Sequence, residues 1–207
     1  MSRLSTTSQF RRDDGMSLVE LILYSGLSML FLTVLAGIFV TSWQADAATR
    51  DRDAATGAAH VVTNSIQTSI RNASSFKVDG SLLRARVATP GGGWECRAWR
   101  LIPLAPQPIE GEQWYELQYN HGNTAIDGAS AGWTNLLGGL GDEDDMVLLV
   151  QGDPDAAAPF GEQGRLLTVT LRVGLVDLDD HRVEALVPVN ADTVPQAWGD
   201  GSPASCW

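Results

Sequence analysis

The sequence predicts an α+β protein, with one long N-terminal helix followed by an antiparallel β-meander domain packed on the second half of that helix. Three observations support this. Residues 21–40 carry no charge, residues 44–73 contain no proline and place apolar residues at helical spacing, and after Ser75 the apolar period changes to two. A helix pattern followed by a run of strand patterns is typical of this fold class.

The uncharged stretch reads LILYSGLSMLFLTVLAGIFV and is followed by Trp43. Twenty helical residues span roughly 30 Å, the thickness of a bilayer core. No second stretch of this kind occurs, so we expect at most one membrane crossing. Three arginines precede the stretch (Arg3, Arg11 and Arg12) and two follow it (Arg50 and Arg52). The excess of positive charge before the stretch favours an N-terminus inside and the larger part of the chain outside.

The segment after the apolar stretch is amphipathic. Its apolar stripe recurs every three or four residues, at Ala48, Ala55, Ala59, Val62, Ile66, Ile70 and Ala73. The opposite face is polar, with Asp46, Arg50, Asp53, His60, Asn64, Gln67 and Arg71. We therefore expect one helix from about Met16 to about Asn72, whose first half contacts lipid or other helices and whose second half contacts a globular domain.

The rest of the chain reads as strands separated by turns. Asp79-Gly80 between two alternating segments is a strong hairpin signal. The predicted strands are 76–78, 82–88, 94–102, 114–119, 146–150, 166–175 and 182–189. The Pro-, Gly- and Asn-rich segments 103–112, 120–145 and 151–164 and the C-terminal 190–207 are expected to be loops or coil.

Composition excludes some classes of function. Acidic residues outnumber basic ones 25 to 14, the formal net charge is -11, and Lys77 is the single lysine. Binding to nucleic acid is therefore disfavoured, because contacts to phosphates need clustered Lys and Arg. Two cysteines, Cys96 and Cys206, are too few for a disulfide-rich scaffold or a zinc site with four thiolates.

One short motif carries the functional information. A polar leader ends at Gly15, the apolar helix begins at once with Met16, and Glu20 is the fifth residue after the glycine. An ionisable group at the edge of a spanning segment is costly and needs a partner, although it can also simply mark the headgroup boundary. The MSLVELIL run and the glycine before it resemble the processing and methylation motif of type IV pilins and type II secretion pseudopilins.

This resemblance covers residues 13–42. It implies cleavage between Gly15 and Met16 by a prepilin peptidase, N-methylation of Met16, and contact of Glu20 with the N-terminal amine of a neighbouring subunit. It also implies a leader of residues 1–15, a membrane and assembly helix 16–43, an amphipathic continuation 44–75 and an extracytoplasmic β-domain 76–207. The long helix followed by a large domain looks most like a larger minor pilin or the J-type minor pseudopilin.

If the domain is exported, Cys96 and Cys206 can form a disulfide. Many pilins close a C-terminal loop with such a bond, so the resemblance implies the same role here. Two buried free thiols are the alternative.

The sequence shows no signature of an enzyme or of a resident cofactor. It lacks a nucleophile elbow, a P-loop and a zinc-protease motif, and His60, His121 and His181 have no ligand spacing. The acidic run 142–145 offers weak calcium ligands, Asp142, Asp144 and Asp145, although such a run is usually a solvated loop. Most tryptophans are expected in the core.

We therefore predict a non-enzymatic minor pilin or pseudopilin without a cofactor. Its predicted partners are a prepilin peptidase, other pilin or pseudopilin subunits and the membrane. The alternatives are a membrane-anchored binding protein or enzyme with an uncleaved anchor, and a secreted extracellular binding protein, for example one that binds carbohydrate. A secretory signal remains open because Ala45, Ala47 and Ala48 follow the apolar stretch.

Overall fold

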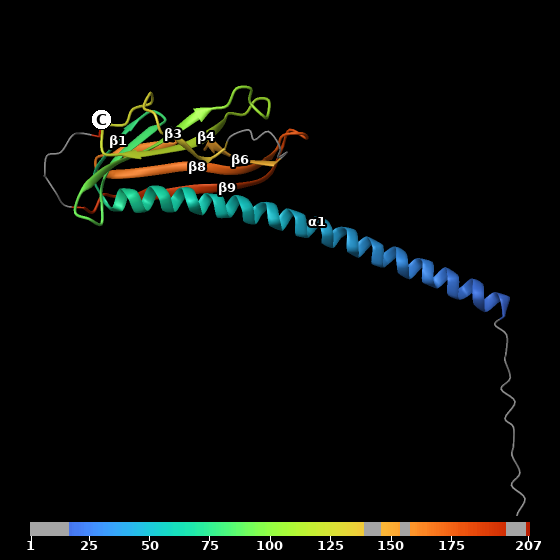
Figure 1. The fold of residues 1–207 in the computed structure, drawn as a ribbon. Helices are drawn as coiled ribbons and strands as arrows, with labels where there is room; N and C mark the ends of the chain where they lie inside the picture. Colours follow the sequence, from blue (N-terminus) through green and yellow to red (C-terminus); the bar gives the residue numbers. More distant parts are fainter. Residues whose placement is uncertain (1–16, 139–145, 154–157, 198–205) are drawn as a thin grey trace, which may run out of the picture. The chain divides into compact units, whose positions relative to one another are not determined.

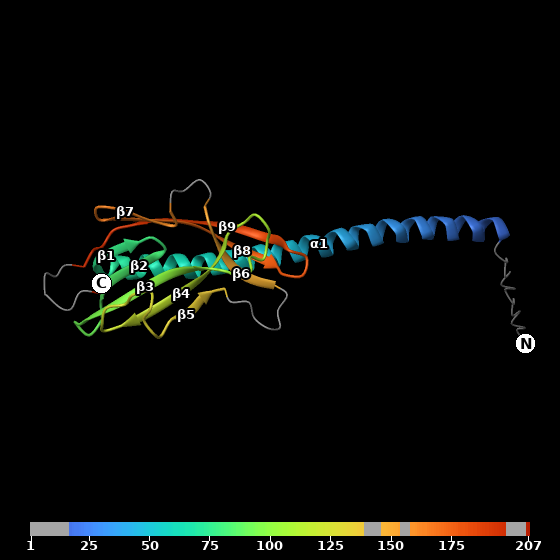
Figure 2. The ribbon, with the colours of Figure 1, turned by 90° about the horizontal axis from the view of Figure 1, so that it is seen from above.

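An apolar N-terminal helix and a curled antiparallel sheet make up the fold, so the predicted α+β class is confirmed (Figures 1 and 2). The computed structural model describes residues 17–138, 146–153, 158–197 and 206–207. Within these ranges the elements are α1 Leu18–Arg71, β1 Ala73–Asp79, β2 Leu82–Ala88, β3 Trp94–Pro103, β4 Trp114–Gly122, β5 Thr134–Leu137, β6 Met146–Gly152, β7 Phe160–Gln163, β8 Leu166–Asp177 and β9 Arg182–Thr193.

The chain divides into two compact units, Met1–Asp46 and Ala47–Trp207. The described part of the first unit is helical throughout, apart from Ser17 at its start. The second unit contains the end of α1 and all the described strands. Each unit is treated by itself below.

The sheet begins as the predicted meander and then departs from it. β1, β2, β3 and β4 pair in sequence order, and every pairing in the sheet is antiparallel. β5 and β6 then share the second edge of β4, while β6 and β7 share one edge of β8 and β9 takes the other. The prediction missed β5 and β7, because these strands have four residues each and lie in segments whose composition indicates loops.

The second part of α1 packs on the sheet, as its apolar stripe predicts. Val62, Ile66 and Ile70 are buried against residues from both halves of the sheet, including Leu83 of β2 and Leu171 of β8. The stripe begins at Ala55, and Ala48 is exposed. Alternate residues of the long strands face α1, and every third or fourth residue of α1 faces the sheet, so the two apolar surfaces pack together.

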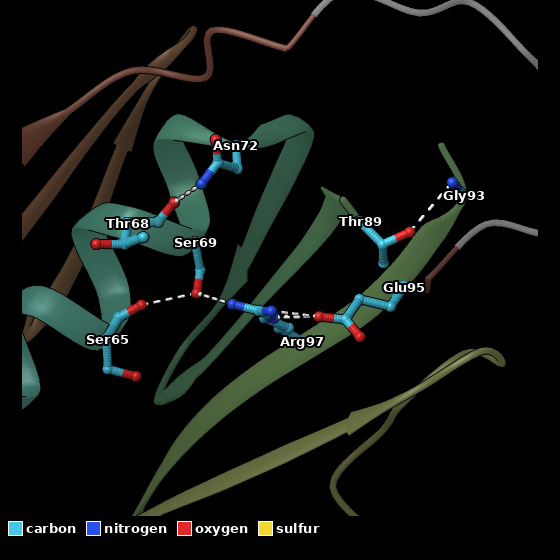
Figure 3. A network of polar contacts seen from close by, with 8 residues as sticks. All are labelled: Ser65, Thr68, Ser69, Asn72, Thr89, Gly93, Glu95 and Arg97. Atoms are coloured by element: carbon cyan, nitrogen blue, oxygen red, sulfur yellow. Dashed lines mark hydrogen bonds and ion pairs between the residues drawn. The ribbon is translucent and has the colours of Figure 1, made fainter. Parts of the chain in front are cut away.

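Polar bonds also fix α1 to β3 (Figure 3). The Ser69 hydroxyl donates to the Ser65 carbonyl (2.7 Å) and accepts from Nη1 of Arg97 (2.9 Å), whose Nε donates to Glu95 (2.5 Å). The indole Nε1 of buried Trp99 donates to the Ser65 hydroxyl (3.1 Å). Buried donors need partners, and moving α1 along the sheet would break these bonds. They therefore fix the position of α1 relative to β3.

A second apolar cluster covers part of the sheet. It contains buried Trp114, Val147, Leu149 and Val176. A Cβ on Gly174 of β8 would lie 2.7 Å from two ring carbons of Trp114, so this indole needs the bare glycine backbone beneath it. Of the tryptophans expected in the core, Trp99 and Trp114 are fully buried, whereas Trp94 and Trp133 are half-buried and Trp207 is exposed, so the expectation is wrong for Trp207.

Candidate functional site

The apolar segment, defined here as residues 18–43, exposes its side chains on every side of the helix. Of its large apolar residues, Leu18 is 75% exposed and even the most covered, Leu35, is 45% exposed. α1 is the one helix in the described ranges that is long and apolar enough to cross a membrane. Water solvates such a surface poorly, so the segment requires lipid or other apolar helices as its surroundings.

Three hydroxyl side chains in the apolar segment bond within the helix. Ser25 donates to the carbonyl of Ile22 (2.9 Å), and Thr33 donates to that of Met29 (2.8 Å). Thr41 makes the same kind of bond (2.9 Å). A polar group in hydrocarbon must be satisfied inside its own segment, and these three residues meet that requirement.

Glu20 is the single charged residue between Leu18 and Ala45, and it lies in the first turn of α1. The positive end of the helix dipole favours a carboxylate at this place. Among the described residues, no hydrogen-bond or ion-pair partner contacts the Glu20 side chain. The two other residues of the sequence motif, Gly15 and Met16, lie outside the described residues.

An aromatic pair marks the C-terminal end of the apolar segment. The rings of Phe39 and Trp43 have centroids 5.9 Å apart and are tilted by 58°, and Trp43 is 68% exposed. Charged residues resume three positions later, at Asp46. Trp is enriched where a spanning helix leaves the hydrocarbon, because its ring is apolar and its N–H is polar.

Cys96 and Cys206 form a disulfide, and the alternative of two free thiols is wrong. Their Cα atoms are 5.4 Å apart across a sequence separation of 110 residues. Both cysteines are buried in a small cluster with Ala98 and Ile126, on the face of β3 opposite to the one that Trp99 uses for α1. The backbone N–H of Ile126 donates to the Cys206 carbonyl (3.3 Å).

The chain after β9 has a role that sequence reasoning missed. The backbone N–H of Gln196 donates to the carbonyl of Arg71 (3.0 Å), the last residue of α1, and that of Ala197 donates to the carbonyl of Ala73 (3.2 Å). The last carbonyls of a helix have no N–H donor within the helix, and a residue far along the chain supplies a donor to one of them here. No local sequence signal identifies such a pairing, because it depends on where β9 ends in space.

The structure does not test the candidate calcium ligands. Asp142, Asp144 and Asp145 lie outside the described residues, so the structure does not place them. In the part of the chain that the structure describes, no cluster of three His, Cys, Asp or Glu side chains could hold a metal ion. His181 bonds through Nδ1 to the carbonyl of Pro108 (2.8 Å), and His121 stacks on Tyr119.

Comparison of the chain with protein-family models, with curated proteins and with solved structures finds no match in any of the three.

Proposed function

We propose that this chain is a structural subunit, a minor pilin or pseudopilin, that is processed by a prepilin peptidase and assembled into a fibre like a type IV pilus or a type II secretion pseudopilus. The observation that carries the proposal is an apolar helix segment with no buried residue and with one carboxylate, Glu20, in its first turn. A helix of this kind suits lipid before assembly and other apolar helices after it.

The proposal gives Glu20 a defined partner. Cleavage between Gly15 and Met16 creates an α-amine at the start of the mature chain, and the Glu20 carboxylate pairs with that amine on a neighbouring subunit. A charge inside a helix bundle is tolerated when an opposite charge neutralises it, because Coulomb attraction is strong at low dielectric. The ion pair therefore selects a neighbour and sets the stagger between subunits.

The membrane arrangement follows from the same proposal. The leader stays on the cytoplasmic side, where the peptidase acts, and the unit Ala47–Trp207 lies outside. The Cys96–Cys206 disulfide supports an oxidising compartment for this unit. The chain acts without catalysis, and its size and long irregular loops favour a minor subunit over the repeating one.

Mass spectrometry of the mature N-terminus tests the proposal most directly. A mature chain that starts at N-methylated Met16 supports it. A chain that keeps Met1 would identify an uncleaved anchor, and one that starts after Ala45 would identify a secreted protein, and either result contradicts the proposal.

Gly15→Ala provides the matched variant, because the peptidase reads a minimal side chain before the scissile bond. We expect this variant to retain the 15-residue leader on a denaturing gel. Equal mobility of wild type and variant would contradict the processing step.

A further inference from the structure

A cleft of about 590 Å³ opens in the unit Ala47–Trp207. Its walls come from the segment before β4, the end of β6, residues 153 and 158–159, and strands β8 and β9. The volume lies in the range of small-molecule sites. The residues that matter for its chemistry are Glu112, Gln113, Gln151, Asp153, Arg172 and Leu186.

Glu112 is held in place by two donors. Its Oε2 accepts from the indole Nε1 of Trp114 (3.0 Å) and from Nε2 of Gln151 (3.1 Å). Trp114 is fully buried, so the carboxylate cannot rotate away without leaving that N–H unsatisfied. Neither bond uses Oε1, which gives the cleft a fixed, negatively charged acceptor.

Arg172 already has a carboxylate counter-ion. Its Nη2 pairs with Oδ1 of Asp153 (3.0 Å), and the two side chains are 28% and 16% exposed. The pair cancels its own charge, so the cleft keeps the negative charge of Glu112. A phosphate or carboxylate ligand is therefore disfavoured, and the described residues offer no three-ligand metal site.

The amides supply both donors and acceptors. Oε1 of Gln113 accepts from the Tyr115 hydroxyl (2.9 Å), which orients the Gln113 amide and leaves its N–H groups as donors. Gln151 donates to Glu112 and keeps its own amide oxygen as an acceptor. A compact cation would use the acceptors alone, whereas a hydroxyl can donate to Glu112 and accept from Gln113.

The remaining wall is apolar. Leu186 of β9 is 38% exposed, and Val183 and Pro159 also line the cleft. The cleft thus combines a hydrogen-bonding side with an apolar side. A sugar ring has the same division, with hydroxyl groups around its edge and C–H groups on its faces.

We propose that this cleft binds a neutral sugar residue of hexose size, with a hydroxyl donating to Glu112 and a C–H face on Leu186. The proposal goes beyond the role as a fibre subunit and does not depend on it, because the cleft lies in the second unit and uses neither Glu20 nor the leader. In a fibre, such a site would let the subunit contact glycan surfaces.

The experiment uses the full chain in dodecylphosphocholine micelles, because this detergent has no sugar headgroup. Saturation-transfer difference NMR measures binding of the methyl glycosides of glucose, galactose, mannose and N-acetylglucosamine. We expect at least one to bind saturably with a Kd of about a millimolar.

Leu186→Ala should weaken this binding roughly tenfold by removing the apolar wall. The matched control is Val194→Ala, which truncates a similarly exposed apolar residue (42%) outside the cleft and should keep the wild-type affinity. Glu112→Gln should also weaken binding, because hydrogen bonds to a charged acceptor are stronger than those to an amide. Melting curves by circular dichroism identify any variant that fails to fold.

Three results would overturn the proposal. The first is that none of the four glycosides binds. The second is binding that Leu186→Ala and Glu112→Gln both leave unchanged in folded protein. The third is Glu112-dependent binding of spermidine with no glycoside bound, which would identify a site for organic cations.

Discussion

Two segments of the single described helix use apolar residues for opposite purposes. In the apolar segment, residues 18–43, Leu30 is 65% exposed, whereas in the domain-side segment, residues 47–71, Ile66 is 1% exposed. The first segment is apolar on all sides, and the second has one apolar stripe with a polar opposite face. An all-round apolar surface needs an environment outside the chain, whereas a stripe is satisfied by one partner within it.

The difference separates folding from insertion and assembly. Apolar residues of the domain-side segment pack on the sheet. Truncating them therefore lowers the free energy of unfolding of the second unit. Residues of the apolar segment contribute little to that free energy, and truncating them affects contacts with lipid or with other subunits. The predictions below test this separation, from the largest effect on the stability of the second unit to the smallest.

Ile66→Ala should destabilise the second unit by about 3 kcal/mol, because it empties a fully packed position between α1 and the sheet. Leu30→Ala is the matched control and should leave the unfolding transition unchanged. Chemical denaturation followed by circular dichroism in micelles measures both. Equal effects of the two variants would contradict the separation.

Loss of the disulfide in a Cys96→Ser, Cys206→Ser double variant should cost about 2–5 kcal/mol, since the bond closes a long loop and constrains the unfolded chain. The denaturation midpoint of this variant gives the effect. Thiol labelling of unreduced, denatured wild type checks the premise, because two labelled thiols per chain would show that the bond does not form.

Gly174→Ala should destabilise the second unit by about 1–3 kcal/mol, because the new methyl group meets the ring of Trp114 at 2.7 Å. Gly122→Ala serves as the control, since a Cβ at that glycine meets nothing within 4 Å. Thermal melting of both variants compares them. A wild-type melting temperature in Gly174→Ala would show that Trp114 can shift.

Tyr119 should cause a smaller, pH-dependent effect. Burial raises the pKa of Tyr119 above 10.0, Arg97 partly opposes this, and Glu95 adds to it. Above pH 10 the unfolded chain therefore loses this proton before the folded one, so stability falls as pH rises. The stability of Tyr119→Phe should therefore fall less steeply with rising pH than that of wild type. Denaturation midpoints at several alkaline pH values measure the slopes.

Glu20→Gln should leave the stability of the second unit unchanged, because Glu20 belongs to the other unit. Under the proposed function, the variant is still cleaved and inserted but loses its attraction to the Met16 amine of a neighbour. We expect it to be depleted from sheared fibres, measured by immunoblot against the membrane fraction. If the variant enters fibres as well as wild type does, Glu20 has no part in assembly and only marks the headgroup boundary.

Several elements could be predicted from local patterns. The helix ends at Arg71, one residue before the predicted Asn72. The hairpin predicted at Asp79-Gly80 forms with Gly80 (φ 63°) and Ser81 as its turn, one residue further along than predicted. β8 and β9 were predicted too short, since they run to Asp177 and Thr193. Pairing between these two strands extends both beyond the point where their own alternation is clear.

The sequence by itself determined which side chains are apolar and at what period, and this was enough for the spanning segment, the buried stripe and the order of helix and strands. It also supplied the motif around Glu20. These properties are local, since each depends on residues within a few turns of one another.

Only the tertiary structure decided the rest. It brought Cys206 to Cys96, placed Gln196 on the carbonyl of Arg71, and set Glu112 beside Gln151 at the edge of a cleft. Each of these contacts joins residues 39 or more positions apart. Such contacts depend on the curl and register of the sheet, which follow from the packing of all the strands together and from no single segment.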